Sequence, residues 1–163
     1  MERIIDVARY IFREYEKLSS TPIDEMMLHK LLYFAQRESF AITGAPMFEE
    51  NFEGWKYGPV SRVVRHCYMK GGLNDSEGDD ISPENAYIAK NVLLQYGVYE
   101  SWKLSDLSHK ELSWRNARRG LSPEENGTRI LSMDDIRKDA EKVRPYDPIW
   151  DMYYDEFDNV EEA

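Results

Sequence analysis

Three consecutive residues, Trp55, Lys56 and Tyr57, combine side-chain types that commonly recognise another macromolecule. Tryptophan and tyrosine dominate the hot spots of protein interfaces, and the lysine adds a positive charge. Gly58 and Pro59 follow, a pair that predicts a bend and a helix beginning at Pro59. The positive end of that helix would suit an anion or a partner's carboxylate. The three side chains therefore form either a partner-binding patch or a packed corner in which only Lys56 faces solvent.

His109 and Trp114 are two further candidates for contact with a partner. Residues 108–111 match a capping box, which predicts a helix start and places His109 just after the Ser108 cap. There the imidazole either bonds neighbouring backbone or points to a partner, and Trp114 either packs in the core or makes contact. His29, in contrast, lies in a largely apolar stretch and is expected to be a buried, hydrogen-bonded histidine.

Residues 146–163 form an acidic segment that is unusually rich in aromatic side chains. Seven of these residues are acidic and none is Lys or Arg, so residues 1–145 carry only −3 of the net charge of −10. A segment this acidic is expected by default to be solvated and disordered. Its aromatic residues, among them Trp150, Tyr153 and Tyr154, suggest two other uses: folding back on the domain, or clamping a basic surface of a partner. We expect a basic protein partner and no nucleic-acid partner, because binding to phosphates needs a net basic face.

The residue patterns of common catalytic and cofactor sites are missing from the sequence. The three histidines have no metal-ligand spacing, and there is no C-x-x-C, G-x-S-x-G, phosphate-binding loop or Gly-rich dinucleotide turn. Cys67 falls on the apolar side of a predicted helix and is expected to be an inert core thiol. We therefore expect no enzyme activity, cofactor or metal; catalysis by Cys67 or a histidine is the weaker alternative.

Size and composition predict one cytoplasmic domain. The chain has 163 residues, enough for a single core, and no apolar run approaches the roughly 20 residues of a membrane span. Glu2, Arg3 and Asp6 argue against a secretory signal at the N-terminus. The single cysteine cannot form an internal disulfide, which fits a reducing compartment.

Apolar residues at helical spacing predict a mainly α, compact single-domain bundle of about six or seven helices. The helices are expected at residues 2–17, 23–42, 59–70, 83–96, 102–107 and 109–119, with a last helix from about residue 132. The helix at 23–42 is apolar on nearly all sides, which predicts a buried central helix. Thr21 is its expected cap, Pro22 its first residue and Asp24 a capping-box acid. A small β-hairpin is expected near residues 46–57.

Three segments, in this order, resemble the SocA-like antitoxins, also called the Panacea domain family. They are residues 28–36 (LHKLLYFAQ), residues 52–60 (FEGWKYGPV) and residues 104–114 with Ser108, His109 and Trp114. The third motif of the family usually reads Thr-His and then Pro-Trp; here Ser108 replaces the threonine and Ser113 the proline. The resemblance assigns residues 1–145 to a SocA-like domain, leaves residues 146–163 as a tail, and implies a mostly α fold.

The resemblance also implies a function, that of an antitoxin which neutralises a protein toxin by direct binding. The alternatives are an adaptor that delivers the toxin to a cellular protease, and a phage-associated interaction protein. For both the antitoxin and the adaptor, the expected partner is a toxin encoded next to this chain. The residues expected to contact it are Trp55, Lys56, Tyr57, His109, Trp114, Trp150, Tyr153 and Tyr154.

Overall fold

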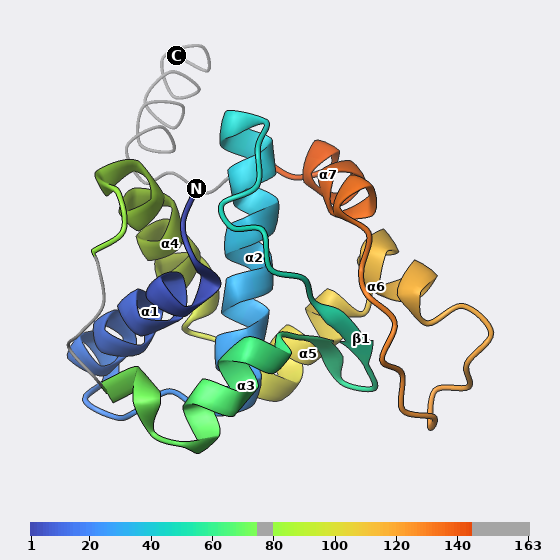
Figure 1. The fold of residues 1–163 in the computed structure, drawn as a ribbon, viewed down its shortest axis with the longest axis horizontal. Coiled ribbons are helices and arrows are strands. Elements are labelled where there is room, and N and C mark those ends of the chain that lie inside the picture. Colours follow the sequence, from blue (N-terminus) through green and yellow to red (C-terminus); the bar gives the residue numbers. More distant parts are fainter. Residues whose placement is uncertain (75–79, 145–163) are drawn as a thin grey trace, which may run out of the picture.

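Helix α2 (Glu25–Thr43) runs through the middle of the molecule, and the other elements pack round it (Figure 1). The structure is a computed structural model that describes residues 1–74 and 80–144. Within these residues the chain forms seven α-helices, one short 3-10 helix and one two-stranded hairpin. The remaining elements are α1 (Ile4–Ser19), β1 (Glu53–Trp55), β2 (Gly58–Val60), α3 (Arg62–Met69), η1 (Gly72–Asn74), α4 (Pro83–Tyr96), α5 (Ser101–Ser108), α6 (Leu112–Ala117) and α7 (Met133–Glu141). The predicted mainly α fold is confirmed.

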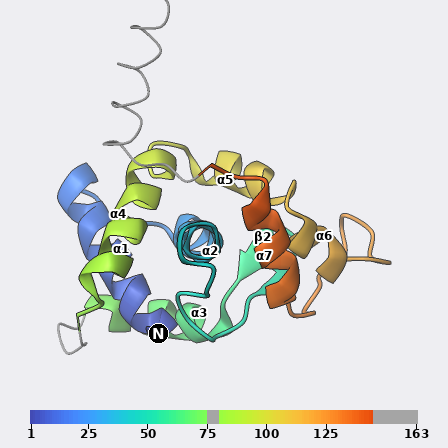
Figure 2. The same ribbon diagram turned by 90° about the horizontal axis from the view of Figure 1, so that it is seen from above.

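The central position of α2 agrees with its sequence. Every residue from Met27 to Phe40 is buried, as expected for a helix that is apolar on nearly all sides. Seen along its axis, α2 has α1 and α4 on one side and α6 and α7 on the other, with α5 and α3 closing the ring (Figure 2). Polar side chains within α2 are therefore enclosed as well, and each needs a partner from a neighbouring element.

The predicted start of α2 is wrong by three residues. The side chain of Asp24 accepts a hydrogen bond from the N–H of Met27 at 2.8 Å, so Asp24 caps the helix. Thr21 and Pro22 lie before the helix and are exposed. A carboxylate at this position is a better cap than a threonine, because it also interacts with the positive end of the helix.

The hairpin is confirmed, although it lies later in the chain than expected. Strands β1 and β2 pair antiparallel, Trp55 faces Gly58 in the register, and Lys56 and Tyr57 form the turn. Pro59, expected to open a helix, is instead the middle residue of β2. Helix α3 begins after Ser61, whose hydroxyl accepts the N–H of Val64 at 3.3 Å.

The predicted capping box at residues 108–111 is wrong. Ser108 is the last residue of α5, and its hydroxyl donates to the carbonyl of Ser105 at 2.7 Å. Helix α6 begins at Leu112, and its start is capped from another helix. The carboxylate of Asp139 in α7 accepts the N–H groups of Leu112 and Ser113 at 2.8 and 3.0 Å. A cap supplied by the tertiary structure has therefore replaced the local one.

None of the described helices has the length and apolar character needed to span a bilayer. Cys67 is half-buried and packs against the core. The acidic aromatic segment at residues 146–163, with Trp150, Tyr153 and Tyr154, lies outside the described residues.

Candidate functional site

The turn of the hairpin presents two of the predicted residues at the surface. The side chain of Tyr57 is exposed, whereas Lys56 is half-buried and forms an ion pair with Glu124 at 3.0 Å. The ammonium of Lys56 also lies 5.2 Å from the centre of the Tyr57 ring. The packed-corner alternative, in which only Lys56 faces solvent, is therefore wrong, because Tyr57 is the more exposed of the two.

Trp55 forms one side of the same surface. Its indole is half-buried, and the guanidinium groups of Arg62 and Arg65 lie 5.6 and 5.3 Å from its ring. Its ring nitrogen donates to Glu53 at 3.2 Å. Two cations and one carboxylate thus contact the indole.

Trp114 and His109 support the hairpin from the other side. The ring nitrogen of Trp114 donates to the carbonyl of Trp55 at 2.8 Å, and the imidazole of His109 stacks on the Trp114 indole at 4.1 Å. The hydroxyl of Ser105 donates to the carbonyl of Tyr57 at 2.6 Å. Burial lowers the pKa of His109 below its usual value, which favours the neutral ring in this stack. Trp114 therefore holds the hairpin directly, and His109 packs behind Trp114; partner contact through either side chain stays a prediction.

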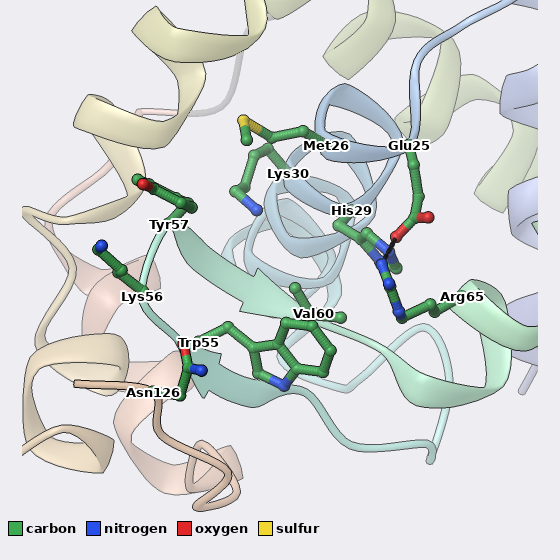
Figure 3. Close-up of a pocket in the computed structure, with 10 residues that line it drawn as sticks. All are labelled: Glu25, Met26, His29, Lys30, Trp55, Lys56, Tyr57, Val60, Arg65 and Asn126. Atoms are coloured by element: carbon green, nitrogen blue, oxygen red, sulfur yellow. Dashed lines mark hydrogen bonds and ion pairs between the residues drawn. The ribbon is translucent and has the colours of Figure 1, made fainter. Parts of the chain in front are cut away.

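A pocket of about 430 Å³ opens beside the hairpin, between α2, the β strands and α3 (Figure 3). Helix α2 contributes Glu25, Met26, His29 and Lys30 to its lining. The other lining residues are Trp55, Lys56, Tyr57, Val60, Arg65 and Asn126. The three aromatic and basic residues singled out in the sequence thus lie on one rim of a pocket that the sequence did not reveal.

Lys30 is the most unusual residue of this pocket. Its side chain is 1% exposed, and Figure 3 shows its ammonium pointing from α2 toward the hairpin. There it donates to the carbonyl of Pro59 at 3.2 Å. Burial lowers its pKa to about 7, and the nearby carboxylates of Glu25 and Asp24 offset this only in part. A lysine in a largely apolar helix was the signal in the sequence that could have identified it.

His29 lies beside Lys30 and is buried, as predicted. Its Nδ1 accepts the N–H of Ser61 at 3.3 Å, so the proton of the neutral ring is on Nε2, which donates to Glu25 at 3.1 Å. Burial lowers the pKa of His29 despite this carboxylate. Glu25 also pairs with Arg65 at 2.6 Å, and these partners together lower the pKa of Glu25. The carboxylate of Glu25 is therefore ionised and already engaged.

Within residues 1–74 and 80–144, no three His, Cys, Asp or Glu side chains gather in a way that could hold a metal ion. The pocket presents an aromatic wall, a buried amine, and further basic side chains at its rim.

Comparison with known protein families shows the class to which this chain belongs. Residues 28–115 match the model of the family described as antitoxin SocA-like, Panacea domain. This match covers more than half of the chain and runs from α2 to α6, so the protein belongs to the SocA-like Panacea family.

Over 51 residues the chain is 43% identical to a protein called antitoxin SocA from Caulobacter vibrioides (strain NA1000 / CB15N). The aligned stretch is 31% of this chain and 27% of the relative, so the chain spans about a quarter of the relative's length. No solved structure matches the chain.

Proposed function

We propose that this protein is an antitoxin that neutralises a protein toxin by binding it directly, with the hairpin and its pocket as the contact surface. Membership of the SocA-like Panacea family supports the antitoxin role. The observation that carries the binding surface is the position of Trp55, Lys56 and Tyr57 on the rim of one pocket. Aromatic side chains beside a pocket and cations are the usual composition of an interface hot spot.

The way the hairpin is held also supports this surface. Hydrogen bonds from three different elements reach its backbone: Trp114 of α6 to Trp55, Ser105 of α5 to Tyr57, and Lys30 of α2 to Pro59. A loop fixed in this way loses little conformational entropy when a partner binds, so more of the interaction energy contributes to affinity.

Co-expression with the gene product encoded next to this chain tests the proposal. We expect the wild-type protein to restore growth and to co-purify with that product. Tyr57→Ala should weaken the complex at least about tenfold, because an exposed aromatic hot spot is removed. Tyr99→Ala is the matched control, since Tyr99 is also a surface tyrosine but lies between α4 and α5. Failure of the wild-type protein both to rescue and to co-purify would refute the antitoxin role.

The half-life of the toxin distinguishes direct blocking from delivery to a protease. Blocking by occupation predicts the same half-life with and without this protein, whereas an adaptor shortens it. A protease partner, a basic toxin surface facing the tail at residues 146–163, the cytoplasmic location and the phage association all remain predictions from the sequence.

A further inference from the structure

The ammonium of Lys30 has fewer acceptors than it has protons. A charged lysine carries three N–H donors. Within residues 1–74 and 80–144 the structure supplies one acceptor, the carbonyl oxygen of Pro59, and no carboxylate lies at ion-pair distance. Glu25, on the same helix, is engaged with Arg65 and His29. A buried cation with unused donors is unfavourable unless another group completes its shell.

The surroundings of Lys30 limit what that group can be. Met26, Trp55 and Val60 give the pocket apolar walls. Among the described lining residues Lys30 is the cation without a carboxylate partner, because Arg65 and Lys56 are held in ion pairs by Glu25 and Glu124. Its volume of about 430 Å³ falls in the range of about 300–1,000 Å³ that is usual for ligand sites. The complementary ligand is therefore an anion carried on an apolar stem. Because the donors lining the pocket are side chains and not a run of backbone N–H groups, a side-chain carboxylate suits it better than a chain terminus.

We propose that this pocket binds the side-chain carboxylate of an Asp or Glu residue of the protein partner, with the carboxylate against Lys30 and the neighbouring apolar atoms against Met26 and Trp55. The inference rests on the proposed function, because it names the part of the toxin that the hairpin surface holds. It also gives a role to Gly58, whose missing side chain leaves the space through which the Lys30 chain passes.

The ionisation of Lys30 is consistent with this role. Burial holds its pKa at about 7 in the free protein, so near neutral pH the amine is poised between its charged and neutral forms. An incoming carboxylate favours the charged form, and the resulting ion pair is shielded from water. Loss of one partner of such a pair weakens binding strongly, because the other charge stays buried and unpaired.

The test uses the full chain labelled with ¹³C at the lysine Cε atoms, whose chemical shift follows the ionisation of Nζ. The Lys30 signal is assigned by its loss in Lys30→Met. The probes, added at millimolar concentration, are N-acetyl-Leu-Glu-Leu-amide, its Gln analogue, and N-acetyl-Leu-Leu with a free C-terminal carboxylate. We expect the Glu peptide to raise the pH at which Lys30 titrates, and the Gln peptide to leave it unchanged.

Variants separate a specific site from general attraction. Lys30→Met should lower the affinity for the Glu peptide at least about tenfold. Lys138→Met is the same change at an exposed site on α7 and should leave the affinity for this peptide unchanged. Thermal unfolding curves serve as the check that both variants are folded. Equal responses to the Glu and Gln peptides, or no response to either, would overturn the carboxylate assignment, and a response to the free terminus alone would overturn the side-chain assignment.

These outcomes differ from those that test the antitoxin role. If the wild-type protein neutralises the toxin but the titration of the Lys30 signal does not change when the Glu peptide is added, the pocket assignment fails and the proposed function stands. If the Glu peptide binds Lys30 but the neighbouring gene product is neither bound nor neutralised, the proposed function fails and the carboxylate site stands.

Discussion

Gly58 lies directly against the side chain of Lys30. A Cβ atom at residue 58 would come within 2.5 Å of the Lys30 Cε and 2.6 Å of the Ser108 hydroxyl. The backbone of Gly58 also has a φ of +122°, which is unfavourable for residues with a side chain. The glycine therefore allows three elements, α2, β2 and α5, to meet at the base of the pocket.

Gly58→Ala should lower the free energy of unfolding by roughly 3 kcal/mol, because it combines backbone strain with overpacking against Lys30. Gly44→Ala is the matched control. Gly44 also has a positive φ, of +75°, but a Cβ atom at residue 44 would meet nothing within 4 Å. Its replacement should cost only about 1 kcal/mol. Urea unfolding measures both, and equal losses would show that the close contact with Lys30 has no energetic effect.

The buried amine of Lys30 should make stability depend on pH. Its pKa of about 7 in the folded protein lies below the value of about 10.4 for an unfolded lysine. Between these pH values the unfolded chain binds more protons, so stability should rise with pH. Below about pH 7 the amine is charged in both states, and its destabilising effect is fully present.

Lys30→Met should remove this dependence and stabilise the protein by about 1–4 kcal/mol near pH 7, since an apolar residue of similar length replaces a buried cation. The difference in unfolding free energy between Lys30→Met and the wild type should shrink by up to about 1.4 kcal/mol per pH unit above pH 7. Other ionisable groups around the amine are Asp24, Glu25, His29, Lys56, Arg65 and His109. The two imidazoles have lowered pKa values and are neutral in this range. Urea unfolding measures this difference, and a difference in unfolding free energy that stays constant with pH would contradict the lowered pKa of Lys30.

Carboxylate binding should be coupled to proton uptake. Above pH 7 the free Lys30 is mostly neutral, so formation of an ion pair with the Glu peptide requires a proton from solvent. Affinity should therefore fall as pH rises above 7, by up to about tenfold per pH unit. Calorimetry in buffers of different ionisation enthalpy measures the protons taken up. The same uptake in a complex with Lys30→Met would assign the proton to another group.

Trp114→Phe should loosen the hairpin without unfolding the protein. The change removes the N–H that bonds the carbonyl of Trp55 at 2.8 Å but keeps an aromatic ring beside His109. Loss of this bond should cost about 1 kcal/mol in unfolding free energy and weaken toxin binding through the displaced Trp55. Trp102→Phe, at an exposed position of α5, is the control. Comparable losses for both variants would argue against the supporting role of Trp114.

Much of the fold could be predicted because local patterns agree with the tertiary structure. Ser82 before Pro83 starts α4, Ser132 caps α7, and the apolar circumference of α2 places it at the centre. Prediction failed where a distant group replaced a local one. Residues 108–111 satisfy a capping pattern, yet Asp139 caps α6 from another helix, because its carboxylate reaches two backbone N–H groups at once.

By itself the sequence determined most of the helices, the family resemblance and the choice of Trp55, Lys56 and Tyr57 as candidate contact residues, because periodicity and residue type are local properties. Only the tertiary structure decided that Lys30 of α2, which lies about 25 residues before Trp55 in the chain, lines the pocket bordered by these three residues. The physical reason is packing: burial of α2 on all sides forces its single lysine toward the gap left by Gly58, and burial in turn lowers the pKa of the amine.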